Sequence, residues 1–203
     1  MGQAQTKTSK SPINPNTMEQ SLNKEGLEEA TLAGGCFWCL EAVFQRLNGV
    51  VAVESGYAGG HKDKPTYKEV CNGDTGHAEV VKITFDPKVL SYEELVKTFF
   101  GIHDPTTLNR QGNDEGTQYR SAIYYHNEGQ KKIAEEVKQN LENMKKWKDP
   151  IVTEIAPLSN YSKAEDYHQD YFNNNGTTNS YCKLVVKGKL DKFLKEYSDK
   201  LKQ

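Results

Sequence analysis

Short apolar stretches that end at glycine or proline predict five β-strands along this chain. The pattern is sharpest in residues 76–87, where Val81, Ile83 and Phe85 occupy alternate positions, which is the period of a strand. Proline cannot continue a hydrogen-bonded ladder, so the step from Asp86 to Pro87 ends this strand. The other predicted strands cover residues 28–35, 50–60, 119–127 and 149–158.

Helical patterns lie between and after these strands. In residues 37–48 the apolar side chains from Leu40 to Leu47 fall at i, i+3, i+4 and i+7, which predicts a helix with one buried face. Residues 91–104 begin with Ser91, and Glu94 follows three residues later, a combination typical of a capping box. The remaining predicted helices cover residues 128–147 and 163–172.

The order of these elements predicts the class of fold. Strands and helices alternate irregularly, which indicates an α+β domain, a two-layer α/β sandwich with a mixed sheet. Between residues 29 and 126 the order is β-α-β-β-α-β, which is that of a ferredoxin-like core. We therefore expect residues 28–203 to form one domain. Residues 1–27 are polar and predict a disordered N-terminal arm, whose first residues also fit a short pattern for N-myristoylation.

Charge and composition narrow the class of partner. The net charge is −2 and the isoelectric point about 6.2, so no basic excess marks a nucleic-acid binder. No apolar run approaches the roughly 18 residues of a membrane-spanning helix. We expect a cytoplasmic monomer that binds a small or neutral partner, with no membrane, cofactor or metal ion. An upstream signal or lipid anchor that has been removed would change the compartment.

The cysteines carry the candidate chemistry. Cys36 lies where a predicted strand ends in Gly34 and Gly35 and a helix begins, and we expect the helix N-terminus to lower its pKa. Cys36 and Cys39 form a C-x-x-C pair with three interpretations: a thioredoxin-like redox pair, part of a zinc site, or a single nucleophile with Cys39 as a packing or secondary thiol. A zinc site lacks further ligands at suitable spacing, since the histidines are isolated.

Five segments of the chain, in order and with matching spacing, resemble the methionine sulfoxide reductase A family. They are GCFWCLEAVFQRLNGV, VESGYAGG, PTYKEVCNGDTGHAEVV, HDPT and NRQGNDEGTQYRSAIYY, and the resemblance covers roughly residues 29 to 182. It implies an α/β fold around a mixed sheet. It also implies reduction of the S epimer of methionine sulfoxide, free or in proteins.

The resemblance also implies roles for individual residues. Cys36 is the nucleophile, and Phe37 and Trp38 form the apolar site for the substrate's S-methyl group. A sulfoxide oxygen leaves poorly unless it is protonated, and a buried carboxyl could supply the proton. By position in the motifs, the acid is Glu79, and the remaining site residues are Tyr67, Tyr119 and Asp114. The tyrosines would hydrogen-bond the oxygen, leaving a sulfenic acid on Cys36.

A second thiol must then remove the sulfenic acid. Cys182 lies in a polar, Asn-rich C-terminal segment that we expect to be mobile, and relatives often carry a recycling cysteine there, so we favour a Cys36–Cys182 disulfide reduced by thioredoxin. Cys39, where relatives often have glycine, is the alternative resolver or a relay thiol; Cys71 we expect to be buried. Two rival functions remain open: a thiol-disulfide oxidoreductase without a small substrate, and a non-catalytic module that binds oxidised methionine.

Overall fold

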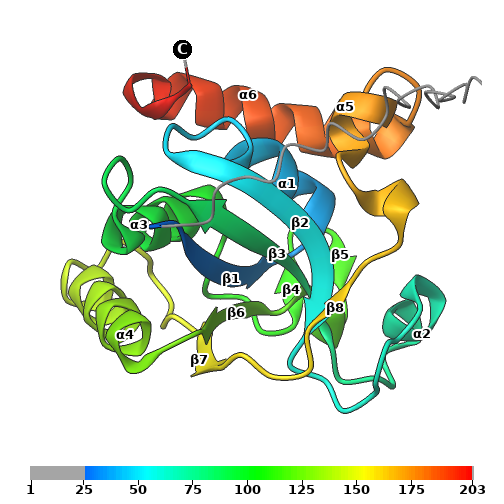
Figure 1. Cartoon of the computed structure of the whole chain (residues 1–203), viewed down its shortest axis with the longest axis horizontal. Coiled ribbons are helices and arrows are strands. Elements are labelled where there is room, and N and C mark those ends of the chain that lie inside the picture. Colours follow the sequence, from blue (N-terminus) through cyan, green and yellow to red (C-terminus); the bar gives the residue numbers. More distant parts are fainter. Residues whose placement is uncertain (1–25, 203) are drawn as a thin grey trace, which may run out of the picture.

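The structure, a computed structural model, describes residues 26–202 (Figure 1). The predicted disordered arm and its myristoylation pattern lie almost wholly outside the described residues. Only Gly26 and Leu27 of that arm are described, and they lead through a turn into the first strand, β1 (Glu28–Gly34). No helix within the described part of the chain is long and apolar enough to cross a membrane.

Six strands form one sheet in the order β7-β6-β1-β3-β2-β8. The pair β6–β7 is parallel and the other pairs are antiparallel, which makes the sheet mixed, as predicted. The inner order β6-β1-β3-β2 follows the predicted β-α-β-β-α-β core, with α1 (Phe37–Phe44) after β1 and α3 (Tyr92–Ile102) after β3. The bounds of the other strands are β2 Val50–Ala58, β3 Ala78–Phe85, β6 Ser121–Tyr125, β7 Glu154–Pro157 and β8 Ser162–Lys163.

The alternation of β3 separates two cores. Val81, Ile83 and Phe85 pack in the main core with residues of α1, α3, α4 (Glu128–Asn143) and α6 (Lys187–Glu196). Val80 points to the opposite face of the sheet, where it packs in a smaller cluster with side chains of β1, β2 and β6. Figure 1 shows α6 running along one edge of the molecule beside α1. Because side chains two residues apart share a face of a strand, Glu79 lies on the same face as Val81, toward the helices.

The structure differs from the predicted elements mainly after residue 143. The last predicted turn of the helix over 128–147 is absent. The single helix predicted over 163–172 is instead a 3-10 turn, η2 (Asp166–His168), followed by α5 (Tyr171–Asn175). The segment around Cys182, predicted as a polar mobile stretch, forms a π-helix, η3 (Cys182–Val186), that continues into α6.

Several short elements were not predicted. One is α2 (Tyr67–Asn72), which has a complete capping box between Thr66 and Glu69. The predicted box at Ser91 is half formed, because its hydroxyl accepts from the Glu94 N–H at 3.2 Å without the reciprocal backbone bond. The remaining elements are β4 Arg110–Gln111, β5 Asp114–Glu115, η1 Thr117–Tyr119 and η4 Ser198–Lys200.

Candidate active site

Cys36 occupies the N-cap position of α1, with φ −59° and ψ 123°, so it lies just outside the first helical turn. The preceding Gly35 has φ +92°, and a Cβ there would lie 2.6 Å from Gln111. Glycine is therefore needed at this junction both for its backbone conformation and for the close approach. The thiol side chain is 6% exposed, at the end of β1 and the start of the helix.

Burial changes the expected acidity of this thiol. We expected the helix N-terminus to lower the pKa of Cys36, and this prediction is wrong. Loss of solvation raises the pKa of Cys36 well above its usual value, and the nearby Cys39 and Glu79 raise it further, whereas the Trp38 backbone N–H lowers it only in part. Cys36 is therefore a neutral thiol at pH 7.

Glu79, the predicted acid, is a buried carboxyl beside Cys36, the predicted nucleophile. Its side chain is 1% exposed, and its Oε2 accepts a hydrogen bond from the backbone N–H of Phe37 at 3.0 Å. Burial raises its pKa to about 8, a rise that the hydrogen bond from Phe37 only partly offsets. A carboxyl with this pKa holds a proton at neutral pH and can transfer it to a reacting group.

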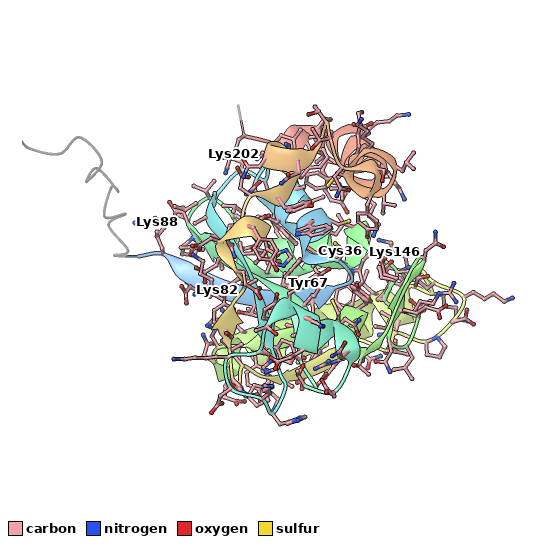
Figure 2. The ribbon with its side chains drawn as sticks, turned by 90° about the vertical axis from the view of Figure 1, so that its right-hand side faces the viewer. Cys36, Tyr67, Lys82, Lys88, Lys146 and Lys202 are labelled. Atoms are coloured by element: carbon pink, nitrogen blue, oxygen red, sulfur yellow. The ribbon has the colours of Figure 1, made fainter. Side chains whose placement is uncertain are left out.

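Two tyrosines share the environment of Glu79. Tyr67 begins α2, and its ring stacks on that of Phe37 with centroids 6.4 Å apart. Burial raises the pKa of both Tyr67 and Tyr119, and the charge of Glu79 is the second cause for each. The charge of Cys36 also raises the pKa of Tyr119. The predicted acid, the predicted nucleophile and the two phenols are therefore neighbours. Figure 2, which labels Cys36 and Tyr67, shows both on the face turned toward the viewer.

Aromatic rings surround Trp38 beside this group. Its indole lies flat against Tyr171, with centroids 3.8 Å apart and planes 7° from parallel. Its Nε1–H donates to Nδ1 of His168 at 3.1 Å, and His168 also lies 5.0 Å from the Phe37 ring. Phe37 is buried and Trp38 is half-buried, so together they present an apolar surface next to Cys36. Such a surface suits a small apolar group such as a methyl.

A buried carboxylate that the sequence did not single out fixes one wall of this aromatic group. Glu41, in α1, accepts the backbone N–H groups of Asp170 at 2.9 Å and Tyr171 at 3.2 Å. Burial raises its pKa to about 7. The only local signal was an acidic residue in the apolar helix segment FWCLEAVF. Glu41 therefore positions Tyr171 against Trp38, although Glu41 and Tyr171 are more than one hundred residues apart in the sequence.

Asp114 and Cys71 lie at the margins of this site. Asp114, in β5, accepts a hydrogen bond from the Tyr181 hydroxyl at 2.7 Å, and Tyr181 meets Trp38 edge-on at 6.1 Å. Cys71 is exposed, contrary to our expectation, and its thiol and the Tyr67 hydroxyl share a hydrogen bond. Among residues 26–202 no three His, Cys, Asp or Glu side chains gather in a way that could hold a metal ion.

Three cysteines lie in one apolar cluster. Cys36, Cys39 and Cys182 pack together with Ala42 and Val186, and all three are free thiols. The two thiols of Cys36 and Cys39 interact, because Cys36 lowers the pKa of Cys39 and Cys39 raises that of Cys36. The pKa of Cys182 is raised by burial and by Cys39, but Cys36 is not among its causes. Cys39 therefore interacts with both of the other thiols.

Comparison with known proteins agrees with this geometry. A sequence model described as peptide methionine sulfoxide reductase matches residues 28–202. The peptide methionine sulfoxide reductase MsrA of Saccharolobus solfataricus is 55% identical over 176 residues, which cover 87% of this chain and 98% of that protein.

Solved structures are similar as well. Mxr1 of Saccharomyces cerevisiae in reduced form has a TM-score of 0.70 and 39% identity over 77% of this chain and 90% of its own. Mxr1 in complex with Trx2 has a TM-score of 0.50 and 28% identity over 72% of this chain and 86% of its own. The chain therefore belongs to the peptide methionine sulfoxide reductase family, as an enzyme of the MsrA kind.

Proposed function

We propose that this enzyme reduces the S epimer of methionine sulfoxide, free or in proteins, through a sulfenic acid on Cys36 and an intramolecular disulfide that thioredoxin recycles. The observation that carries the proposal is the buried, protonated carboxyl of Glu79, which bonds the first helical N–H next to Cys36. A reductase of sulfoxides needs an acid at this place, whereas disulfide exchange or simple binding does not.

The substrate's S-methyl group packs against Phe37 and Trp38, which turns the sulfoxide oxygen toward Glu79, Tyr67 and Tyr119. These three groups are neutral at pH 7 and donate hydrogen bonds to the oxygen, whose negative charge grows as Cys36 attacks sulfur. Glu79 delivers a proton to that oxygen, and the Cys36 thiol gives its own proton to the Glu79 carboxylate so formed as its sulfur attacks. The oxygen passes to Cys36, so one thiol and one sulfoxide become one sulfenic acid and one thioether.

Cys39 is the first thiol that the sulfenic acid meets. Sequence favoured a direct Cys36–Cys182 disulfide, with Cys39 as the alternative. The packing of Cys36 and Cys39 in one apolar cluster supports the alternative, as does the position of Cys36 outside the first helical turn. We propose that Cys39 displaces water from the sulfenic acid to form Cys36–Cys39. Cys182 then attacks Cys39, which moves the disulfide toward the C-terminal helix and frees Cys36.

Thioredoxin is the reductant that the comparisons support. A structure of the related Mxr1 contains Trx2 as its partner. A reduced thioredoxin has a low reduction potential, so it can reduce a disulfide formed among these cysteines. The expected monomeric state and cytoplasmic location stay predictions.

The test is steady-state turnover with thioredoxin, thioredoxin reductase and NADPH, measured separately on the S and R epimers of methionine sulfoxide. Turnover of the S epimer alone, abolished by Cys36→Ser, is the expected result. Cys71→Ser is the matched control, because it removes an exposed thiol outside the cluster while keeping a hydroxyl for Tyr67. Thioredoxin oxidation without sulfoxide loss would favour a disulfide oxidoreductase, and sulfoxide binding without turnover a binding module.

A further inference from the structure

A cavity of about 600 Å³ lies between α1, α3 and α6. Cys39 of α1 lines it, together with the apolar side chains of Phe100, Trp147 and Phe193. None of the residues assigned to sulfoxide binding or protonation is among its lining residues. The cavity therefore gives access to the thiol cluster by a route separate from the substrate's.

Cationic side chains give this cavity its chemical character. Lys146 and Lys189 line it, and neither forms an ion pair with another residue in the described range 26–202. Lys192 is offset by Glu196, 3.8 Å away, and the carboxylate of Asp104, which accepts from the Thr106 hydroxyl at 2.6 Å, adds one negative charge. Lys146 lies 4.9 Å from the centre of the Trp147 ring, and Figure 2 shows it to one side of Cys36. Three lysines and two carboxylates leave an excess of one positive charge, and this charge, next to a thiol and an apolar wall, suits a ligand that carries carboxylates.

We propose that this cavity binds a small thiol bearing carboxylate groups, which reduces the Cys36–Cys39 disulfide by attacking the sulfur of Cys39. This inference rests on the proposed function, because that function produces the disulfide. Lys146 and Lys189 hold the carboxylates of the small thiol, and its sulfur reaches Cys39 from the cavity. Cys39 lines the cavity although it is only 3% exposed, so it is accessible to a thiol small enough to enter the cavity and not to the surface of a folded protein.

The electrons and atoms of this step balance with two molecules of the small thiol. The first thiolate forms a bond to Cys39 and breaks the Cys36–Cys39 bond, which releases the Cys36 thiolate. The second thiolate attacks the small thiol's sulfur in the mixed disulfide and releases Cys39. Two thiols are oxidised to one disulfide, and Cys36 and Cys39 are reduced.

The first experiment compares a charged thiol with a neutral one. Full-length protein carrying Cys182→Ser, in which the disulfide stays between Cys36 and Cys39, is oxidised by one turnover of methionine sulfoxide. The recovery of its thiols is followed with glutathione or 2-mercaptoethanol at equal thiolate concentration. We expect the rate with glutathione to saturate and the rate with 2-mercaptoethanol to rise linearly. Lys146→Gln and Lys189→Gln should each lower the glutathione rate roughly three- to tenfold and change the 2-mercaptoethanol rate less than twofold.

Lys195→Gln is the matched control, because it removes the same charge from the exposed surface of α6 and does not line the cavity. It should leave both rates unchanged. Equal losses with both thiols in the two cavity variants, or a linear glutathione dependence in the protein that keeps both lysines, would overturn the proposal. Failure of the oxidising turnover itself would instead overturn the proposed function, so the two failures are distinguishable.

A second experiment maps the point of attack without any sulfoxide. Protein with Cys36→Ser and Cys71→Ser is incubated with oxidised glutathione, and the mixed disulfide is located by peptide mass analysis. The proposal predicts the adduct on Cys39, with slower formation when Lys146→Gln is added. An adduct on Cys182 in place of Cys39, or formation at the same rate in the lysine variant, would contradict it.

Discussion

Replacement of Glu79 by Gln should separate the chemistry of the site from its stability. The amide keeps the size of the carboxyl, and its oxygen can still accept the hydrogen bond from the Phe37 N–H that Glu79 accepts at 3.0 Å. It cannot transfer a proton to the sulfoxide oxygen. General acid catalysis contributes roughly 10²- to 10⁴-fold, so we expect a loss of this size in the rate of the sulfoxide step.

The free energy of unfolding should rise in Glu79→Gln, whereas the rate of the sulfoxide step falls. Burial raises the pKa of Glu79 from 4.5 to about 8, so the folded protein binds a proton that the unfolded chain releases above pH 4.5. Folding stability of the unmodified protein therefore falls as pH rises from 4.5 to about 8. At about 1.4 kcal/mol per pH unit, this cost reaches roughly 3 kcal/mol at pH 7. Glu79→Gln removes the cost.

The assay is urea unfolding of both proteins at pH 4.5, 6 and 7, beside single-turnover methionine formation at pH 7. The variant should gain stability relative to the unmodified protein as pH rises, from near zero at pH 4.5 to roughly 3 kcal/mol at pH 7. In the unmodified protein, the sulfoxide step should slow above pH 8 as Glu79 loses its proton. A difference in stability that is constant with pH, or a variant that forms methionine at the original rate, would refute the reasoning.

Three further substitutions test the packing around the thiols. Glu41→Gln should raise the KM for sulfoxide several-fold with a smaller change in kcat, because a neutral amide holds the ring stacked on Trp38 less firmly; steady-state kinetics decide this. Tyr181→Phe removes the bond to Asp114 and should lower the free energy of unfolding by about 1–3 kcal/mol in thermal melts. Gly35→Ala should destabilise the protein more than Gly73→Ala in urea, since both have positive φ but only Gly35 would meet neighbouring atoms.

The strands and the position of Cys36 at a strand-to-helix junction could be predicted because their signals are local. Alternation of apolar residues predicted that Val81, Ile83 and Phe85 share one face of their strand, and the structure places all three in the main core. The glycine pair before Cys36 marked the strand-to-helix junction, where Gly35 has the positive φ that glycine permits.

The features that sequence missed depend on contacts between distant segments. Glu41 receives its hydrogen bonds from residues more than one hundred positions away, so nothing near it identifies its role. The acidity of Cys36 was predicted wrongly because the helix N-terminus is visible in the sequence while the depth of burial is not. The π-helix at Cys182 forms where Asn179 accepts the Cys182 N–H at 3.1 Å, in a stretch whose polar composition suggested a loop.

The most direct test of the account is a single turnover of the pre-reduced protein with racemic methionine sulfoxide and no external reductant. The epimers are resolved, methionine is counted, and the new disulfide is mapped by peptide mass analysis at successive times. The account predicts loss of the S epimer only and about one methionine for each disulfide formed, with Cys36–Cys39 appearing before any bridge to Cys182. Oxidation of Cys36 and Cys39 without consumption of sulfoxide would contradict it.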